Sequence, residues 1–207
     1  MDFQAWLTFA GFWVVFVTSP GPNAVNCIQN GMTYGFGRAL WGVAAILTQS
    51  LLFLALSALG ITALITASPT GFLAAQIAGA AVLLWLGLRS WLRASKPLAA
   101  DPKPPQKIYA HAFAVATINP KSVAGYLAAF SQFVSPDQPI GQQMWVIVPT
   151  AMTITFASYA SYTALGTWMG RRALSAIAST SIRRVLAACF VIYGLALAAA
   201  ALAPLWA

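Results

Sequence analysis

The sequence predicts an all-α polytopic membrane protein, in which six transmembrane helices form two inverted three-helix repeats and the first and fourth helices are broken. Of the 207 residues, 60% are hydrophobic and 7% are charged, whereas soluble domains average about 25% charged residues. So few charges cannot cover the surface of a soluble protein. Six apolar segments are long enough to cross about 30 Å of hydrocarbon as helices. These segments are approximately 4–28, 39–66, 71–92, 108–134, 144–169 and 184–205.

The basic residues lie in or beside alternate loops, which predicts the orientation of the chain. Ten of the eleven lysines and arginines belong to the first, third and fifth loops, and the second and fourth loops contain none. Loops rich in lysine and arginine face the cytoplasm, so we expect both termini on the outer side. The same rule accounts for the net charge of +8, and we expect no nucleic-acid partner. The ten residues are Arg38, Arg89, Arg93, Lys96, Lys103, Lys107, Arg171, Arg172, Arg183 and Arg184.

One linker divides the single transmembrane domain into two halves. Residues 93–107, RASKPLAADPKPPQK, are basic and rich in proline, a composition typical of a solvated segment without a fold of its own. We therefore predict the first repeat over residues 1–92 and the second over 108–207, with this linker in the cytoplasm.

The first apolar segment is interrupted by SPGPN, residues 19–23. Proline cannot donate to the helical ladder and disfavours helix at the preceding residue. One interpretation is a break inside the membrane that exposes backbone to a polar site. The other is a break at the cytoplasmic mouth, because residues 3–19 nearly span the bilayer alone when the helix is tilted.

The fourth segment contains a second break, Asn119-Pro120-Lys121, and Lys121 is the one basic residue outside the basic loops. From Lys121 to Val134 the chain has 14 residues, or about 21 Å of helix, which is too short to span. Residues 108–118 must then enter the membrane too, which places the break near the midplane. The alternative is a helix that starts at the surface, with Lys121 among the headgroups.

Each break lies in the first helix of a three-helix half. Because three is odd, the second half must be inverted relative to the first. Inverted repeats with a broken helix in each half build the midplane binding sites of many secondary transporters. Non-helical backbone at that depth persists only where protein or a water-filled cavity satisfies it, so the two breaks predict a shared polar site.

The sequence around these breaks resembles that of the lysine exporter (LysE) superfamily, in its homoserine/threonine-resistance branch. The motifs that carry the resemblance are SPGPNAVNCIQNGMTYGFGRALWG, residues 19–42, and INPKSVAGYLAAFSQFV, residues 118–134. Together with the length and the six segments, the resemblance covers the whole chain. It implies a multi-pass exporter of amino acids or their derivatives in the bacterial inner (plasma) membrane, with periplasmic termini. It also implies a functional core of Gly21, Pro22, Asn23, Asn119, Pro120 and Lys121.

The sequence departs from the resemblance in its second segment. Family members often carry a polar or acidic residue there, and this chain offers only Thr48, Gln49 and Ser50. No apolar segment contains a carboxylate. The sequence therefore supplies no carboxylate for proton coupling.

The chemistry of the breaks suits an amino acid. Helices that restart after Pro22 and Pro120 direct their positive N-terminal dipoles into the break, and Lys121 adds a full charge for a carboxylate. Candidate acceptors for the ammonium group are the backbone carbonyls of Thr18, Ser19 and Ile118 and the side chains of Asn23 and Asn119.

The side chain of the substrate has its own candidate readers, which are Gln49, Thr155, Ser158 and Tyr162. The last three recur at helical spacing on the fifth segment, and hydrogen bonding between helices is an equally good explanation of that stripe. Because no acid is available to neutralise a second positive charge, we expect export of neutral amino acids.

Other functions fit the sequence less well. A membrane thiol or electron carrier needs two thiols in contact, but the counterpart of Cys27 in the second repeat is Gly125, and Cys189 lies in the last segment. A divalent metal exporter needs a set of carboxylate, thiolate or imidazole ligands. One histidine and two distant cysteines do not supply that set. We expect no enzyme activity, metal or cofactor. The expected partners are the amino acid and membrane lipid, and a homodimer stays open.

Overall fold

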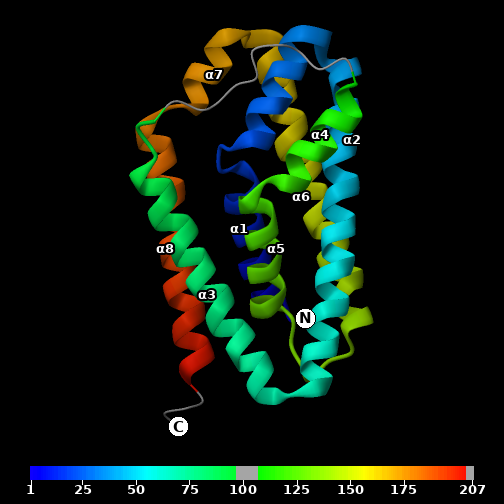
Figure 1. The fold of residues 1–207 in the computed structure, drawn as a ribbon, viewed down its shortest axis with the longest axis vertical. Coiled ribbons are helices and arrows are strands. Elements are labelled where there is room, and N and C mark those ends of the chain that lie inside the picture. The colour runs from blue at the N-terminus through cyan, green and yellow to red at the C-terminus, as the bar shows by residue number, and fades with distance from the viewer. Residues whose placement is uncertain (97–106, 204–207) are drawn as a thin grey trace.

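The computed structural model describes residues 1–96 and 107–203, and within them every regular element is an α-helix. The predicted all-α fold is therefore confirmed (Figure 1). Most of the predicted linker, residues 97–106, lies outside the described part. The helices are α1 (Phe3–Thr18), α2 (Pro22–Ala67), α3 (Pro69–Leu92), α4 (Ile108–Ile118), α5 (Pro120–Phe133), α6 (Ile140–Met169), α7 (Arg171–Ile177) and α8 (Thr180–Leu202).

Both predicted breaks separate two helices in the structure. α1 ends at Thr18 and α2 begins at Pro22, while α4 ends at Ile118 and α5 begins at Pro120. Proline suits the first helical position because that residue has no helical hydrogen bond to donate and its φ is already helical. Asn119 is extended, with φ −68° and ψ 111°, and its side chain accepts a hydrogen bond from the Lys121 backbone N–H at 3.1 Å.

α2 consists of two arms that meet at Gly35. This residue has φ 73° and ψ 166°, a left-handed conformation that a side chain would strain. The first arm, residues 22–34, completes the predicted first segment, and the second arm, residues 36–67, is the predicted second segment. In Figure 1 the first arm rises to the end of the molecule near α7, and the second returns along its length.

Among the described residues, four helical stretches are long and apolar enough to cross a membrane, namely Pro22–Gly60, Leu73–Leu92, Ile140–Met169 and Thr180–Leu202. The six crossings that the sequence predicts are therefore not evident from helix length alone. α1 has 16 residues, α4 has 11 and α5 has 14. Two further crossings require each broken pair, α1 with the first arm of α2 and α4 with α5, to act as one unit.

Two helices begin earlier than the apolar segments predicted for them. α6 begins at Ile140 and α8 at Thr180, four residues before the segments predicted from residues 144 and 184. Polar residues such as Arg183 continue a helix although they would not lie in hydrocarbon. The sequence also did not predict α7, a short helix that buries Ala173 and Ile177.

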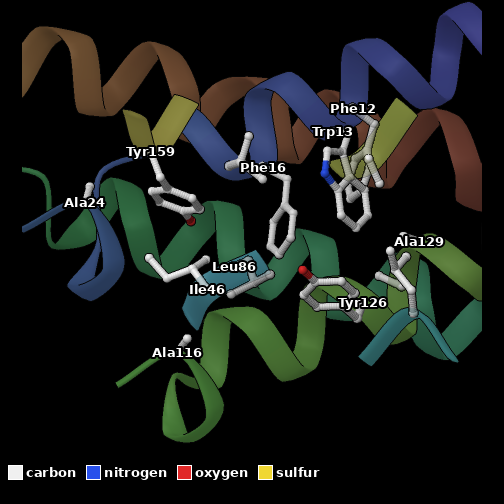
Figure 2. Packing of buried hydrophobic residues seen from close by; sticks show 14 of the residues in the cluster. Phe12, Trp13, Phe16, Ala24, Ile46, Leu86, Ala116, Tyr126, Ala129 and Tyr159 are labelled. Atoms are coloured by element: carbon white, nitrogen blue, oxygen red, sulfur yellow. The ribbon is translucent and has the colours of Figure 1, made fainter. Parts of the chain in front are cut away.

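The helices pack mainly in two groups, and one helix of the broken pair α4–α5 belongs to each group. α2 packs mainly on α6 and α4, whereas α3 packs mainly on α8 and α5. α1 packs on α6 and supplies aromatic side chains to the centre. Figure 2 shows Trp13 and Phe16 near Tyr126 of α5, with ring centroids 5.2 and 5.8 Å from the tyrosine ring.

Different elements lie at the two ends of the molecule. α7 and the Gly35 bend lie at one end of Figure 1, and the α2–α3 turn lies at the other. The N-terminal ammonium donates to Gln138 Oε1 at 2.9 Å, so the N-terminus adjoins the loop between α5 and α6. In Figure 1, α7 and the start of α4 lie near the end of the molecule opposite the α2–α3 turn.

Candidate functional site

The two breaks meet through Lys121. Its Nζ donates a hydrogen bond to the backbone carbonyl of Ser19 at 2.6 Å, although the two residues are 102 positions apart. Gly21 is also close, because a Cβ placed there would lie 3.9 Å from Lys121 Cδ. The N-termini of α2 and α5 therefore open toward the same region, and the ammonium group of Lys121 lies between them.

Neutral groups surround the Lys121 ammonium. Besides the Ser19 carbonyl, the rings of Phe16 and Phe190 have centroids 5.4 and 6.0 Å from Nζ, distances at which an aromatic face attracts a cation. The two aspartates in the described part of the chain, Asp2 and Asp137, are both exposed. Within this part, Lys121 therefore has hydrogen-bonding and aromatic contacts but no carboxylate counter-ion.

A cleft of about 230 Å³ opens at the breaks. Drug-sized ligands occupy pockets of roughly 300–1,000 Å³, so this volume suits a smaller metabolite. Residues of both breaks line it, together with the end of α3 and the start of α8. The lining consists of Ser19, Pro20, Gly21, Pro22, Leu86, Arg89, Ser90, Arg93, Asn119, Lys121 and Arg183.

A second, smaller cavity of about 10 Å³ shares Asn119 and Lys121 with the cleft. It has room for about one water molecule. Side chains from α1, α2, α5 and α6 enclose it, and most of them carry a polar group. They are Phe16, Val17, Asn23, Ile46, Gln49, Ser50, Asn119, Lys121, Ser122, Tyr126, Thr155 and Tyr159.

Two side chains of this inner cavity present buried polar atoms without a hydrogen-bond partner. Asn23 is 5% exposed and its Oδ1 is unpaired, and Gln49 is 1% exposed and its Nε2 is unpaired. Buried polar groups are normally paired, and leaving one unpaired costs about 1–3 kcal/mol. One acceptor and one donor therefore border, together with Lys121, a cavity that has room for about one water molecule.

The polar stripe of the fifth segment lies on α6, and two of its side chains make hydrogen bonds to α1. Thr155 Oγ1 accepts a hydrogen bond from Trp13 Nε1 at 3.0 Å, and the Tyr162 hydroxyl donates to the Thr18 carbonyl at the end of α1. These are the interhelical bonds of the alternative explanation. Thr155 also lines the inner cavity, whereas Ser158 and Tyr162 lie outside the linings of both cavities. Ser158 Oγ is buried and unpaired.

The predicted site residues thus fall into three groups. Gly21, Pro22, Asn119 and Lys121 line the cleft, and Asn23, Gln49 and Thr155 join Asn119 and Lys121 at the inner cavity. Pro120 begins α5 between them, and Ser158 and Tyr162 stand further along α6.

Sequence reasoning missed a ladder of amides on α2. Asn30 Nδ2 donates to Asn26 Oδ1 at 3.0 Å, and Asn26 Nδ2 lies 3.0 Å from Nδ1 of His111 on α4. The signal was available, because Asn23, Asn26 and Asn30 recur at i, i+3 and i+7 on one helical face. His111 is half-buried and belongs to this ladder.

Sequence reasoning also missed two other sets of lining residues. One set belongs to the inner cavity and could not be separated from packing residues, since the sequence does not show which polar side chains of a helix face a cavity. The other set lines the cleft and had been explained by orientation alone. The first comprises Ser50, Ser122, Tyr126 and Tyr159, and the second comprises Arg89, Arg93 and Arg183.

Comparison with known proteins finds matches over nearly the whole chain. The family model for LysE type translocators matches residues 14–201. A relative named as an uncharacterized membrane protein of Vibrio cholerae is 32% identical over 204 residues, covering 97% of this chain and 99% of the relative. No solved structure matches.

Two further relatives have names that state a function. The homoserine/homoserine lactone efflux protein of Salmonella typhimurium is 27% identical over 168 residues, covering 80% of this chain and 82% of that protein. The leucine efflux protein of Enterobacter sp. is 25% identical over 155 residues, covering 73% of this chain and 72% of that protein.

Proposed function

Because the chain belongs to the LysE family of translocators, we propose that it is a secondary transporter that exports a small amino acid or amino-acid derivative from the cytoplasm. The expected family resemblance is confirmed, and the chain is a membrane transporter rather than an enzyme. The relatives named for homoserine and leucine efflux support an amino acid as substrate. Neither a thiol carrier nor a metal exporter gains support from any relative that we found.

The architecture of the proposed transporter has two inverted repeats, residues 1–92 and 108–207, in the bacterial inner membrane. Each broken helix pair crosses as one unit, which gives six crossings with both termini in the periplasm. Two observations support this arrangement. The helix after each break begins at a proline, and the last helices of the two repeats, α3 and α8, pack on each other as an inverted pair would.

The convergence of both breaks on Lys121 carries the proposal. A substrate carboxylate would replace the Ser19 carbonyl as the partner of Nζ, which lies 2.6 Å from that oxygen. Exchange of a neutral acceptor for a charged one strengthens the bond, and the N-termini of α2 and α5 favour the same anion. The substrate ammonium group would lie toward the inner cavity, where Asn23 Oδ1 is an unpaired acceptor. Asn119 lines both the cleft and the inner cavity.

Charge sets the class of substrate that this site favours. A lysine or arginine substrate brings a second positive charge to Lys121, and two like charges about 6 Å apart cost near 3 kcal/mol at an effective dielectric of about 20. That energy corresponds to more than a hundredfold in affinity. We propose a neutral amino acid, with Gln49 and Thr155 as the nearest readers of its side chain and Ser158 and Tyr162 behind them.

Counterflow in proteoliposomes tests the proposal. Purified protein is reconstituted with an internal excess of one unlabelled amino acid, and entry of labelled threonine, homoserine, leucine, lysine or arginine is followed. We expect transient accumulation of neutral amino acids and little of the cationic ones. Equal rates for lysine and leucine would contradict the charge argument, and no counterflow with any of the five would contradict amino-acid export.

A further inference from the structure

Resting on the proposed export function, we infer that Arg89, Arg93 and Arg183 form an anion-binding vestibule, which takes up the carboxylate of the substrate before Lys121 does. The vestibule is the part of the 230 Å³ cleft lined by these three side chains. Its ligand class is a carboxylate on a molecule whose net charge is zero or negative.

Three arginines from two packed helices line the same cleft. Arg89 and Arg93 are four residues apart at the end of α3, where side chains share one helical face. Arg183 lies in the first turn of α8, which packs on α3. All three line the cleft that Lys121 also lines. Four cations therefore border one space the size of a small metabolite.

Neutral contacts hold two of these arginines, Arg183 and Arg89, in position. Arg183 Nη1 donates to the Lys96 carbonyl at 2.6 Å, and Nη2 donates to the Arg93 carbonyl at 2.8 Å. The Arg89 guanidinium lies over the Trp85 ring, 4.8 Å from its centroid. None of these partners is an anion, and no aspartate lines the cleft in the described part of the chain. Within residues 1–96 and 107–203, no acidic side chain therefore pairs with the positive charge of the vestibule.

Membrane orientation alone does not explain this convergence. Loops rich in lysine and arginine need only lie at the cytoplasmic end. Arg171, Arg172 and Arg184 satisfy that requirement at exposed positions and do not line the cleft. Arg184 provides the sharpest contrast, since it adjoins Arg183 in sequence yet lies over the Trp91 ring at 5.5 Å.

A free carboxylate is the ligand that this geometry favours. Guanidinium groups bind carboxylates through paired N–H donors, and a cleft with apolar walls concentrates the field of its charges. The adjoining breaks then receive the same carboxylate at Lys121. N-acylated amino acids keep this group and lose the ammonium charge, whereas amino-acid amides keep the ammonium charge and lose the carboxylate. The former should bind better than the parent zwitterion and the latter should not bind.

Transport kinetics provide the first arm of the test. Everted membrane vesicles carry the wild type, Arg89→Gln, Arg93→Gln or the double variant, and Arg184→Gln serves as the control for charge and orientation. We expect the KM for leucine uptake to rise about tenfold in the double variant with little change in kcat, because charge at the entrance acts mainly on capture. Added salt should raise the wild-type KM but affect the double variant less. Wild-type KM in the double variant, or an equal rise in Arg184→Gln, would overturn the vestibule.

Ligand binding provides the second arm and separates this inference from the proposed function. Calorimetry on purified protein in nanodiscs of neutral lipid should detect N-acetyl-leucine with the wild type and Arg184→Gln, no signal with the double variant, and no binding of leucinamide. Such binding without leucine transport would support the vestibule and contradict leucine export. If anionic lipid abolishes N-acetyl-leucine binding while the leucine KM of the double variant is unchanged, the cleft is a lipid phosphate site and the inference is wrong.

Discussion

At the scale of single residues, Lys121 has the most demanding role. We predict that Lys121→Ala inserts normally but loses transport by about ten- to hundredfold, since a hydrogen bond to a charged group contributes about 1.5–3 kcal/mol. Lys121→Arg should recover little, because the planar guanidinium differs from the ammonium in reach and shape. Efflux assays at matched membrane abundance measure both. Wild-type efflux by Lys121→Ala would remove the residue from the site.

A second residue-scale prediction separates ligand binding from packing at Gln49. Its buried Nε2 has no hydrogen-bond partner, so Gln49→Met removes an unsatisfied group at nearly constant shape. We expect the unfolding midpoint to stay equal or rise while transport weakens. Gln143 is the matched control, because it is equally buried and bonds to Ser135 and Gln138 at 2.9 Å.

Gln143→Met should therefore lower the midpoint and serve as the reference for a structural glutamine. The two midpoints are measured by thermal unfolding in the same detergent. If Gln49→Met destabilises the protein as much as Gln143→Met does, then Gln49 has a structural partner and is not kept for a ligand.

At the scale of elements, Gly125 allows α5 to approach α1. A Cβ at this position would lie 2.1 Å from Phe16 Cε2, and Phe16 is itself packed on Trp13 and Tyr126. Gly125→Ala should therefore lower stability by about 1–3 kcal/mol through overpacking. Gly60→Ala is the control, since a Cβ there meets nothing within 4 Å. Thermal unfolding distinguishes them, and equal midpoints would contradict the close approach.

The sequence predicted where the helices break but not which helices meet. Two prolines after apolar runs predicted both helix breaks, because proline acts on its own neighbours. The 2.6 Å contact between Lys121 and Ser19 had no local signal, since 102 residues separate its ends. Arg89 and Arg93 look alike in sequence to Arg171 and Arg172, and only the packing of α3 on α8 distinguishes them. Local chemistry was thus predictable, and convergence was not.

At the scale of the whole molecule, orientation in the membrane can be tested directly. Asp137→Cys and Ser175→Cys place single thiols at exposed positions near opposite ends, in a background that carries Cys27→Ala and Cys189→Ala. We predict that an impermeant maleimide labels residue 137 in intact spheroplasts. Residue 175 should react only after permeabilisation, because α7 belongs to the basic end that we propose faces the cytoplasm. The reverse pattern would invert the assignment.

The hydrogen bond between Lys121 and the Ser19 carbonyl also bears on how much metabolite the cell loses by export. The proposed exporter must not drain metabolites that a growing cell makes at the expense of ATP. While the ammonium group rests on this backbone oxygen, both breaks are held together by the group that a carboxylate would need. Opening then requires a competitor for that ammonium. We therefore expect the rate of export to rise with the concentration of the exported compound inside the cell, so that little is lost while this concentration is low.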